Sequence, residues 1–283
     1  MRKTRQKQVV IGLIQMEADT KLDSNLEQAV RKIKSAAAQG SQIISLQELF
    51  CTPYFPQEKS HRYFDWAESI PGPTTRLLSR LARQLKVVII APIFERHSSS
   101  RYYNTAVLMD ADGTIIGTYR KAHLPNDPCY YEQFYFKRGN SGFKSYQTKY
   151  GRIGVLICWD QWFPEAARSA ALSGAQILFY PSAIGWLASE EKSVRLKEKA
   201  AWETIQRAHA IANGIYVAAI NRVGREGKLT FWGSSFVADP FGKVLVQGSV
   251  SGEEVLIASC DLMEIDRVRR AWPFIQERRV DAY

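Results

Sequence analysis

Apolar residues along this 283-residue chain follow two spacings, and each spacing predicts one kind of element. Short continuous apolar runs are typical of buried β-strands, whereas apolar residues three and four positions apart are typical of amphipathic helices. The continuous runs predict strands at residues 9–15, 42–46, 87–94, 104–109, 114–119, 153–157, 177–180, 215–220, 234–238, 243–246 and 255–259. The helical spacing predicts helices over residues 22–39, 73–86, 164–173, 190–213 and 262–270.

Glycine and proline mark the boundaries of these elements. Gly40, Gly174 and Gly214 each follow a predicted helix directly, at the position where a left-handed residue commonly ends a helix. Pro73 and Pro164 stand at helix starts, where the missing amide donor is not needed. Strands and helices alternate early, hairpins separate the later helices, and no linker interrupts the pattern. We therefore expect a single domain of the α/β class spanning the whole chain, with mixed sheets covered by helices on their outer faces.

Composition and charge exclude several classes of protein. Hydrophobic residues make up 46% of the chain, but no apolar run reaches the roughly 20 residues that span a bilayer. The net charge is +10, yet the basic residues are scattered, with short concentrations at 2–7, 267–270 and 278–279 and no recognisable nucleic-acid-binding module. The apolar run after the basic start is short and lacks a cleavage site of small residues. We expect a cytoplasmic protein that binds neither nucleic acid nor a membrane.

The four cysteines predict neither a disulfide framework nor a metal site. They lie at positions 51, 129, 158 and 260, far apart in the sequence, and no Cys-x-x-Cys pair or histidine cluster accompanies them.

Three reactive side chains follow predicted strands closely. Glu48 comes two residues after one strand, Lys121 two residues after another, and Cys158 directly after the strand at 153–157. Because ligands gather beyond the carboxyl ends of strands in open α/β sheets, these residues are candidates for one site. Each also has an ordinary interpretation, since a free cysteine is often a core residue and loop-edge charges are usually solvated.

Taken together, the three residues suit the hydrolysis of an amide-like bond. A thiol is mostly protonated at neutral pH and needs a base or a cation to become a nucleophile. Attack on a carbonyl carbon creates an oxyanion, which a fixed ammonium group and a backbone N–H stabilise. His123 and His209 are alternative bases, although nothing in their sequence surroundings favours them.

These residues also carry a family resemblance. Glu48, the segment from Arg120 to His123, and the segment from Cys158 to Glu165 resemble the carbon–nitrogen hydrolase (nitrilase) superfamily over nearly the whole chain. The resemblance implies a four-layer α-β-β-α sandwich, no cofactor, no metal, and a Glu–Lys–Cys triad. It also implies that Glu132 positions Lys121 and the substrate, and that the protein is a homo-oligomer, a dimer or larger.

Within the superfamily, the segments around Cys158, residues 181–185 and residues 221–222 are most similar to enzymes that hydrolyse N-carbamoylputrescine. This implies a small-molecule N-carbamoyl amine as substrate, cleaved to the amine, carbon dioxide and ammonia in polyamine biosynthesis. Two alternatives stay open: the same chemistry on N-carbamoyl-β-alanine or an ω-amide, which would need an arginine facing the cysteine, and a non-catalytic binding subunit.

A cationic substrate tail needs a carboxylate among aromatic walls. Tyr130, Trp159 and Trp186 are candidate walls, Asp160 is a candidate lining residue, and Asp127 and Glu190 are candidate partners of the amine. Acidic residues at 190–191 are also what a helix start prefers. The similar enzymes carry a glutamate soon after residues 181–185, and here Trp186 and Leu187 occupy that place, so the carboxylate must come from elsewhere or the substrate differs.

Overall fold

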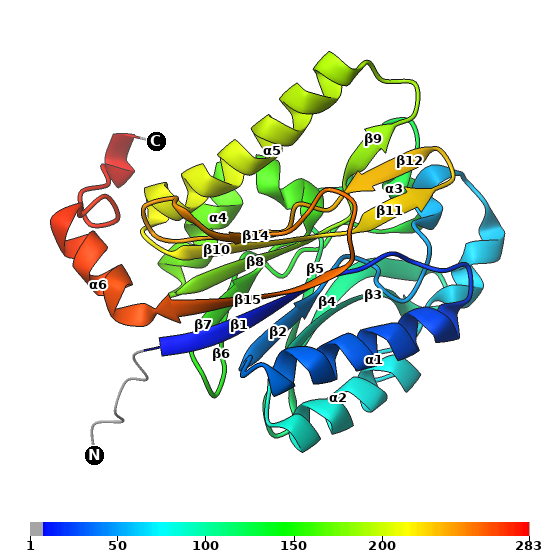
Figure 1. The fold of residues 1–283 in the computed structure, drawn as a ribbon, viewed down its shortest axis with the longest axis horizontal. Coiled ribbons are helices and arrows are strands. Elements are labelled where there is room, and N and C mark those ends of the chain that lie inside the picture. The colour runs from blue at the N-terminus through cyan, green and yellow to red at the C-terminus, as the bar shows by residue number, and fades with distance from the viewer. Residues whose placement is uncertain (1–7, 283) are drawn as a thin grey trace.

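A computed structural model describes residues 8–282 of the chain, so the basic segment at residues 2–7 lies outside the described residues. Two six-stranded sheets pack face to face, and helices cover the outer face of each (Figure 1). The first sheet has the order β15-β1-β2-β3-β4-β5 and the second the order β14-β13-β10-β8-β7-β6. This arrangement confirms the predicted four-layer α-β-β-α sandwich.

The strands of the first sheet are β1 (Gln8–Gln15), β2 (Ile43–Leu46), β3 (Val88–Ser98), β4 (Arg101–Met109), β5 (Ile115–Arg120) and β15 (Glu254–Asp261). The strands of the second are β6 (Ser145–Gln147), β7 (Arg152–Val155), β8 (Ile177–Ser182), β10 (Tyr216–Asn221), β13 (Phe236–Ala238) and β14 (Val244–Gln247). In each sheet the three central strands run parallel, β1-β2-β3 in one and β7-β8-β10 in the other, and antiparallel strands flank them.

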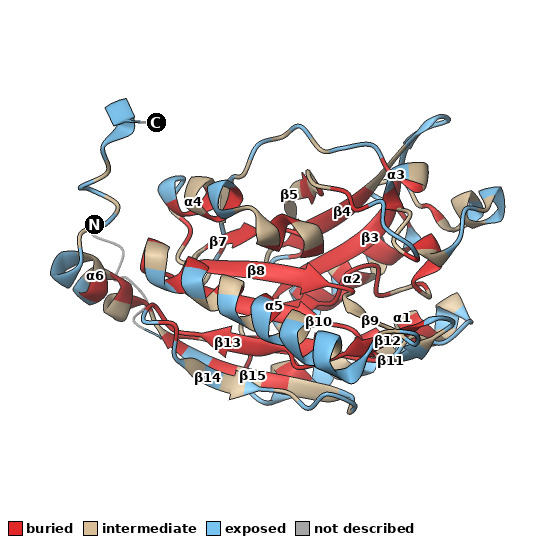
Figure 2. Cartoon of the chain, turned by 90° about the horizontal axis from the view of Figure 1, so that it is seen from above, coloured by how far each residue is buried: buried red, intermediate tan, exposed pale blue. Residues whose placement is uncertain are grey.

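Side chains alternate between two layers of core, as the period of two in a strand requires. In β1, Ile11 and Leu13 lie in the core between the sheets, whereas Ile14 packs against the helices that cover the first sheet. Figure 2 shows the buried strands enclosed by helices whose outer faces are exposed. The covering helices are α1 (Leu22–Ala38) and α2 (Pro73–Leu85) on the first sheet, and α4 (Pro164–Leu172) and α5 (Lys192–Asn213) on the second.

A third sheet was not predicted from the sequence. Its order is β11-β12-β9, formed by β9 (Gly185–Leu187), β11 (Val223–Glu226) and β12 (Leu229–Trp232). Each of these strands has only three or four residues, which is too short for either period of the apolar pattern to mark it.

The remaining elements are short or terminal. They are the helices α3 (Glu132–Tyr135) and α6 (Leu262–Ala271), and the 3₁₀ turns η1 (Phe55–Gln57), η2 (His61–Trp66), η3 (Cys158–Trp162) and η4 (Val280–Ala282). The predicted strand at residues 153–157 is two residues too long, because β7 ends at Val155 and the chain turns at Cys158.

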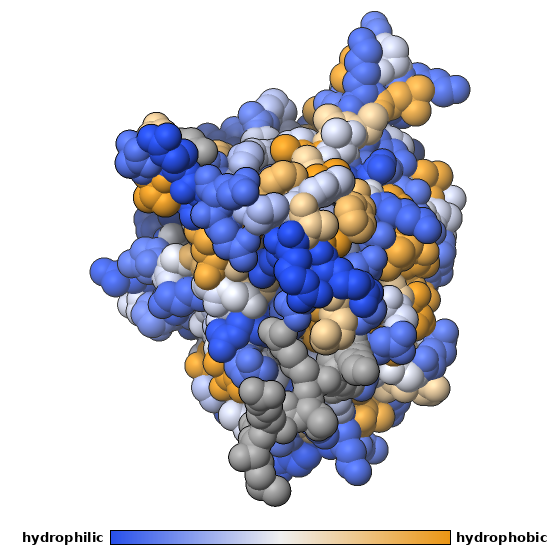
Figure 3. Space-filling view, turned by 90° about the vertical axis from the view of Figure 1, so that its left-hand side faces the viewer, coloured by the Kyte–Doolittle hydropathy of each residue, from blue (hydrophilic) through white to orange (hydrophobic). Residues whose placement is uncertain are grey.

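The surface fits the expectation of scattered charge. Figure 3 shows one face of the molecule, on which hydrophilic side chains predominate and apolar ones form small separate groups. Between residues 8 and 282, no helix combines the length and the apolar character needed to cross a membrane. The same described part of the chain has no group of three or more His, Cys, Asp or Glu side chains placed to hold a metal ion.

Candidate active site

Glu48, Lys121 and Cys158 come from the two sheets and meet at one end of the sandwich. Glu48 lies in the turn after β2, Lys121 follows β5 directly, and Cys158 begins η3 just beyond β7. The backbone holds Lys121 on both sides, since its N–H donates to the carbonyl of Asn104 and its own carbonyl accepts from Gly139. The strand ends therefore fix the backbone positions of the three residues.

Lys121 lies between two carboxylates in the protein interior. Its Nζ is 2.7 Å from Oε1 of Glu48, and 2.8 and 2.7 Å from the two oxygens of Glu132. The side chains of all three residues are completely buried. Burial alone would lower the pKa of Lys121, but the charges of Glu132 and Glu48 more than offset this and raise it. The ammonium group is thus held in its charged form.

The two carboxylates differ in what else they bind. Oε1 of Glu48 also accepts a hydrogen bond of 2.7 Å from Nδ2 of Asn104, whereas its Oε2 is buried with no partner among the described residues. Glu132 accepts a hydrogen bond of 2.8 Å from the hydroxyl of Tyr54. Burial raises the pKa of Glu132 to about 7; the charge of Lys121 opposes this shift and that of Glu48 adds to it. Glu48 therefore keeps one oxygen available for a proton.

Cys158 occupies a strained backbone position, with a φ of 42°. Its side chain is 4% exposed and forms no disulfide. Burial, followed by the charge of Glu48, raises the pKa of the thiol, while Lys121 and the backbone N–H of Ala183 act in the opposite direction. The thiol therefore lies close enough to the carboxylates and the ammonium for their charges to act on it.

Arg222 fixes the turn that carries Glu48. Its guanidinium is fully buried and donates to the backbone carbonyls of Glu48, Leu49 and Thr52 at 2.9–3.1 Å. Glu226 neutralises it through an ion pair of 2.7 Å. A buried arginine with paired charge and several carbonyl acceptors holds such a turn rigidly.

Asp160, expected to line the substrate pocket, has a different place. One oxygen accepts from the hydroxyl of Tyr119 at 2.7 Å and from the backbone N–H of Ile157 at 2.9 Å. The other lies 3.0 Å from the backbone nitrogen and 2.7 Å from Nδ1 of His123. This fully buried carboxylate ties the end of β5 to the turn of Cys158, and it does not line the cavity described next.

A cavity of about 410 Å³ opens onto Cys158. Four of the predicted pocket residues line it, together with two further tryptophans and a further glutamate: Asp127, Tyr130, Trp159, Glu190, Trp162, Trp232 and Glu198. None of its described lining residues carries a positive charge. Trp186 is not among them, because its indole N–H donates to the carbonyl of Arg195 and its ring packs on Trp232 at 5.2 Å.

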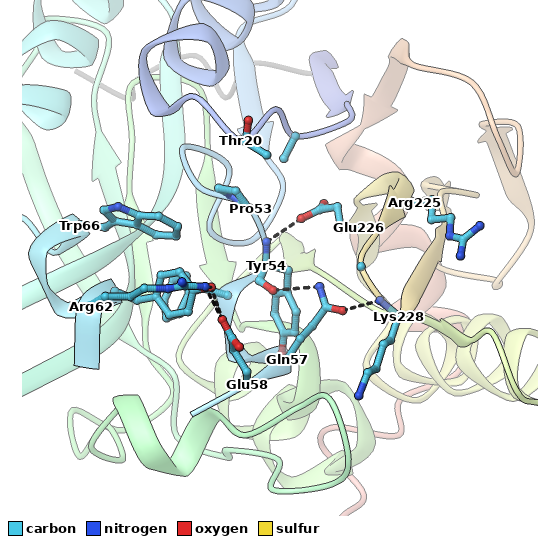
Figure 4. A pocket seen from close by; sticks show the side chains of 14 residues that line it. Thr20, Pro53, Tyr54, Gln57, Glu58, Arg62, Trp66, Arg225, Glu226 and Lys228 are labelled. Atoms are coloured by element: carbon cyan, nitrogen blue, oxygen red, sulfur yellow. Dashed lines mark hydrogen bonds and ion pairs between the residues drawn. The ribbon is translucent and has the colours of Figure 1, made fainter. Parts of the chain in front are cut away.

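A second cavity, of about 610 Å³, lies between the loop at residues 53–66 and the turn that joins β11 and β12 (Figure 4). Its polar groups already bind one another. Glu226 accepts a hydrogen bond from the backbone N–H of Tyr54, and Glu58 forms an ion pair with Arg62. Cys158 does not line it. The cavity beside Cys158, although it is the smaller of the two, is therefore the better candidate for substrate binding.

Comparison with known proteins agrees with the geometry. The family model described as carbon-nitrogen hydrolase matches residues 10–270. The chain belongs to the carbon–nitrogen hydrolase family. It is 41% identical to N-carbamoylputrescine amidase of Arabidopsis thaliana, over 99% of this chain and 95% of that protein, and 39% identical to a citrullinase of Francisella tularensis, over 97% and 96%. A carbon–nitrogen hydrolase structure from Helicobacter pylori, 41% identical, superposes with a TM-score of 0.95 and covers 98% of this chain and 97% of that one.

As a carbon–nitrogen hydrolase, the chain is a hydrolase of carbon–nitrogen bonds, and the predicted family and enzyme class are confirmed. The two histidines weighed as bases lie away from the cavity in this carbon–nitrogen hydrolase. His123 binds Asp160 and stacks on Phe163, and His209 binds the carbonyl of Gln161. Neither lines the cavity.

Several residues of this carbon–nitrogen hydrolase site gave no signal in the sequence. Asn104 lies inside a predicted strand, Tyr54 inside an aromatic loop, and Glu198 inside a predicted helix. Polar residues within regular elements are ordinary, and only the folded structure shows that these three face the cluster or its cavity. The buried position of Asn104 could not be read from its strand, because its direct neighbours Tyr103 and Thr105 both carry hydroxyl groups and give no apolar alternation.

Proposed function

We propose that this carbon–nitrogen hydrolase cleaves N-carbamoylputrescine to putrescine, carbon dioxide and ammonia, and so acts in polyamine biosynthesis. The observation that carries the proposal is the charge of the cavity beside Cys158. Its described lining residues include Asp127, Glu190 and Glu198 but no lysine, arginine or histidine. N-carbamoylputrescine has a ureido group at one end and an ammonium at the other, which matches a nucleophile in an acidic, aromatic cavity. The similarity to the plant amidase supports the same substrate.

In the proposed mechanism, Cys158, Lys121 and Glu48 act as nucleophile, electrostatic stabiliser and base. The thiol sulfur attacks the ureido carbon while Oε2 of Glu48, which has no partner among residues 8–282, accepts the thiol proton. Lys121 and the backbone N–H after Cys158 would stabilise the oxyanion. Because Lys121 is pinned by Glu132 as well as by Glu48, its position would not change when Glu48 becomes protonated.

The remaining steps use the same groups in reverse. Glu48 gives its proton to the departing nitrogen, ammonia leaves, and a thiocarbamate links the substrate to Cys158. Glu48 then takes a proton from water, the resulting hydroxide attacks the same carbon, and the thiolate leaves and is reprotonated. The product is an N-substituted carbamic acid, which loses carbon dioxide to give the amine. No cofactor enters this sequence of proposed steps.

Two other substrate classes share this chemistry. A substrate with a carboxylate tail, such as N-carbamoyl-β-alanine or an ω-amide, would meet an uncompensated negative charge in this cavity. Citrulline carries both an ammonium and a carboxylate, and the similarity to the bacterial citrullinase makes it the more informative competitor.

The test is ammonia release from a panel of N-carbamoylputrescine, citrulline, N-carbamoyl-β-alanine and an ω-amide. We expect the highest kcat/KM for N-carbamoylputrescine and no turnover by Cys158→Ser. A higher kcat/KM for any other member of the panel would overturn the substrate, and full activity of Cys158→Ser would overturn the mechanism. A non-catalytic binding subunit would release no ammonia from any of them, and its Cys158 would show no substrate-protected labelling by iodoacetamide.

We also propose that the enzyme is a cytoplasmic homo-oligomer. The four unpaired cysteines suit a reducing compartment, and α5 exposes the apolar side chains of Val194, Leu196 and Ile211. Burying such side chains is a common reason for subunits to associate. Light scattering on the purified protein tests the assembly, and a monomer at micromolar concentration would contradict it.

A further inference from the structure

The three carboxylates that line the cavity beside Cys158 differ in their solvent exposure and in the hydrogen bonds that they already accept. Asp127 is exposed on a loop, where water screens its charge. Glu190 already accepts a hydrogen bond of 2.9 Å from the backbone N–H of Leu187 and so closes the turn before α5. The part of the chain that the structure describes offers no hydrogen-bond or ion-pair partner to the carboxylate of Glu198, which is only partly exposed.

Glu198 also has a defined direction. It lies in the second turn of α5, and Ala201, three residues later on the same face, lines the cavity as well. A helix of 22 residues holds its side chains more rigidly than the loop that carries Asp127. A carboxylate on this element can therefore recognise a group at a fixed position.

The surroundings of Glu198 favour a cation. Burial, followed by the charge of Glu190, raises the pKa of Glu198, so the two carboxylates repel one another when both are ionised. A positive charge placed between them would remove that repulsion. Trp159, Trp162 and Trp232 provide ring faces in the same cavity, and such faces attract cations.

The wall of the cavity also includes a tryptophan, Trp232, whose polar N–H group forms no hydrogen bond with the described residues. Trp232 is 1% exposed, and its indole N–H has no acceptor among the described residues. An unmet buried donor is unfavourable unless a ligand or a water molecule accepts its hydrogen bond. An indole N–H can only donate, so a carbonyl oxygen of the ligand or a water molecule suits it, whereas the ammonium has to be met by the carboxylates.

Trp186 and Leu187 occupy the place where the resemblance implies a glutamate, and of these two Leu187 lines the cavity. We propose that Glu198 supplies the missing carboxylate and is the residue that recognises the ammonium tail of the substrate, so that the site selects ω-ureido amines over ureas with a neutral tail. The proposal rests on the proposed function, since it assigns one of that site's residues to one end of the substrate. Glu190 contributes charge nearby, and its hydrogen bond to Leu187 keeps it in place.

The test compares two ureas that differ only in the tail. N-carbamoylputrescine ends in an ammonium, and N-pentylurea carries a methyl group in its place. We expect wild-type kcat/KM to favour N-carbamoylputrescine, and Glu198→Gln to reduce the ratio of the two kcat/KM values at least about tenfold, because the variant loses the charge that pairs with the ammonium and no partner of the methyl group. Glu198→Lys should abolish the preference altogether.

Glu191→Gln is the matched control. It removes the same charge from an exposed residue seven positions earlier, which does not line the cavity, so the preference should stay at the wild-type value. Circular dichroism and melting temperature establish that each variant is folded, and glutamine is a good helix former at an α5 position.

The outcomes separate the two proposals. A wild-type enzyme that releases no ammonia from N-carbamoylputrescine overturns the proposed function, and this inference with it. An active wild type whose preference survives in Glu198→Gln, or is lost in Glu190→Gln or Asp127→Asn instead, overturns the assignment of Glu198 alone. A merely structural role for Glu198 would lower the rates on both ureas equally and so leave their ratio unchanged.

Discussion

Glu48 binds Lys121 through one carboxylate oxygen only. Nζ of Lys121 is 2.7 Å from Oε1, which also accepts from Asn104, while Oε2 is buried and unpaired among the described residues. An unpaired buried oxygen is unfavourable in a purely structural ion pair. Here it permits the carboxylate to take up a proton without releasing the ammonium.

Replacing Glu48 by glutamine should remove the base and keep the shape. We expect kcat of Glu48→Gln to fall about 10²–10⁴-fold, the range over which general bases act, with little change in melting temperature because the amide oxygen can still accept from Lys121. Steady-state ammonia release measures this. Retention of more than about a tenth of the wild-type kcat would contradict the role of Glu48.

Asn104 should act through Glu48. Asn104→Leu keeps the approximate volume and removes the donor to Oε1, so kcat should fall about tenfold with KM little changed. Asn104→Asp is the sharper companion, because it sets a second carboxylate against Glu48 and should lower kcat further. If the two variants matched wild-type kcat, the hydrogen bond would have no part in positioning the base.

Glu132 should make stability depend on pH between about 4.5 and 7. Its pKa is about 7 in the folded protein, above the ordinary value of 4.5 expected in the unfolded chain. The folded protein therefore binds this proton more tightly, and the resulting stabilisation is complete below about pH 4.5 and lost as pH rises through about 7. Urea titrations should show wild-type unfolding free energy falling over this window by about 1–3 kcal/mol relative to Glu132→Gln. Parallel curves for the two proteins would show that Glu132 titrates normally.

Asp160 should be a stability residue with an indirect effect on rate. Asp160→Asn keeps the shape but loses the charge that accepts from Tyr119, His123 and the backbone of Ile157, and should reduce unfolding free energy by about 2–4 kcal/mol. Tyr119→Phe removes one of these bonds and should cost about 1 kcal/mol. Thermal and urea unfolding measure both. An Asn variant as stable as wild type would mean that the network is already satisfied without the charge.

The apolar periods of the long elements predicted mixed sheets covered by helices on their outer faces, and the family resemblance implied the four layers. The sequence also placed Glu48, Lys121 and Cys158 at strand ends, which is where the structure has them. It could not predict the sheet of β9, β11 and β12, in which β11 and β12 form a hairpin of four-residue strands and the three-residue β9 pairs with β12 from more than 40 positions away. Long-range pairing of short strands leaves no local pattern.

Individual roles within the pocket were predicted less well than the cluster itself. Asp160 follows the cysteine closely in sequence, yet the 3₁₀ turn directs its carboxylate into the interior. Glu198 is one of many charged residues along α5, and helical spacing alone does not distinguish a cavity face from a solvent face when both are polar. Both outcomes depend on packing between elements that are distant in the chain.

The small sheet of β9, β11 and β12 keeps part of the cavity wall structurally separate from the reacting groups. It supplies Leu187 and Trp232 to the cavity wall, whereas Glu48, Lys121 and Cys158 belong to the ends of the two large sheets. Mutations that reshape the hairpin can thus alter which tail fits while the reacting groups keep their geometry. The ion pair of Glu226 with Arg222 and its hydrogen bond from Tyr54 join the hairpin to the turn of Glu48, so substitutions elsewhere in the hairpin can change tail specificity without moving the base.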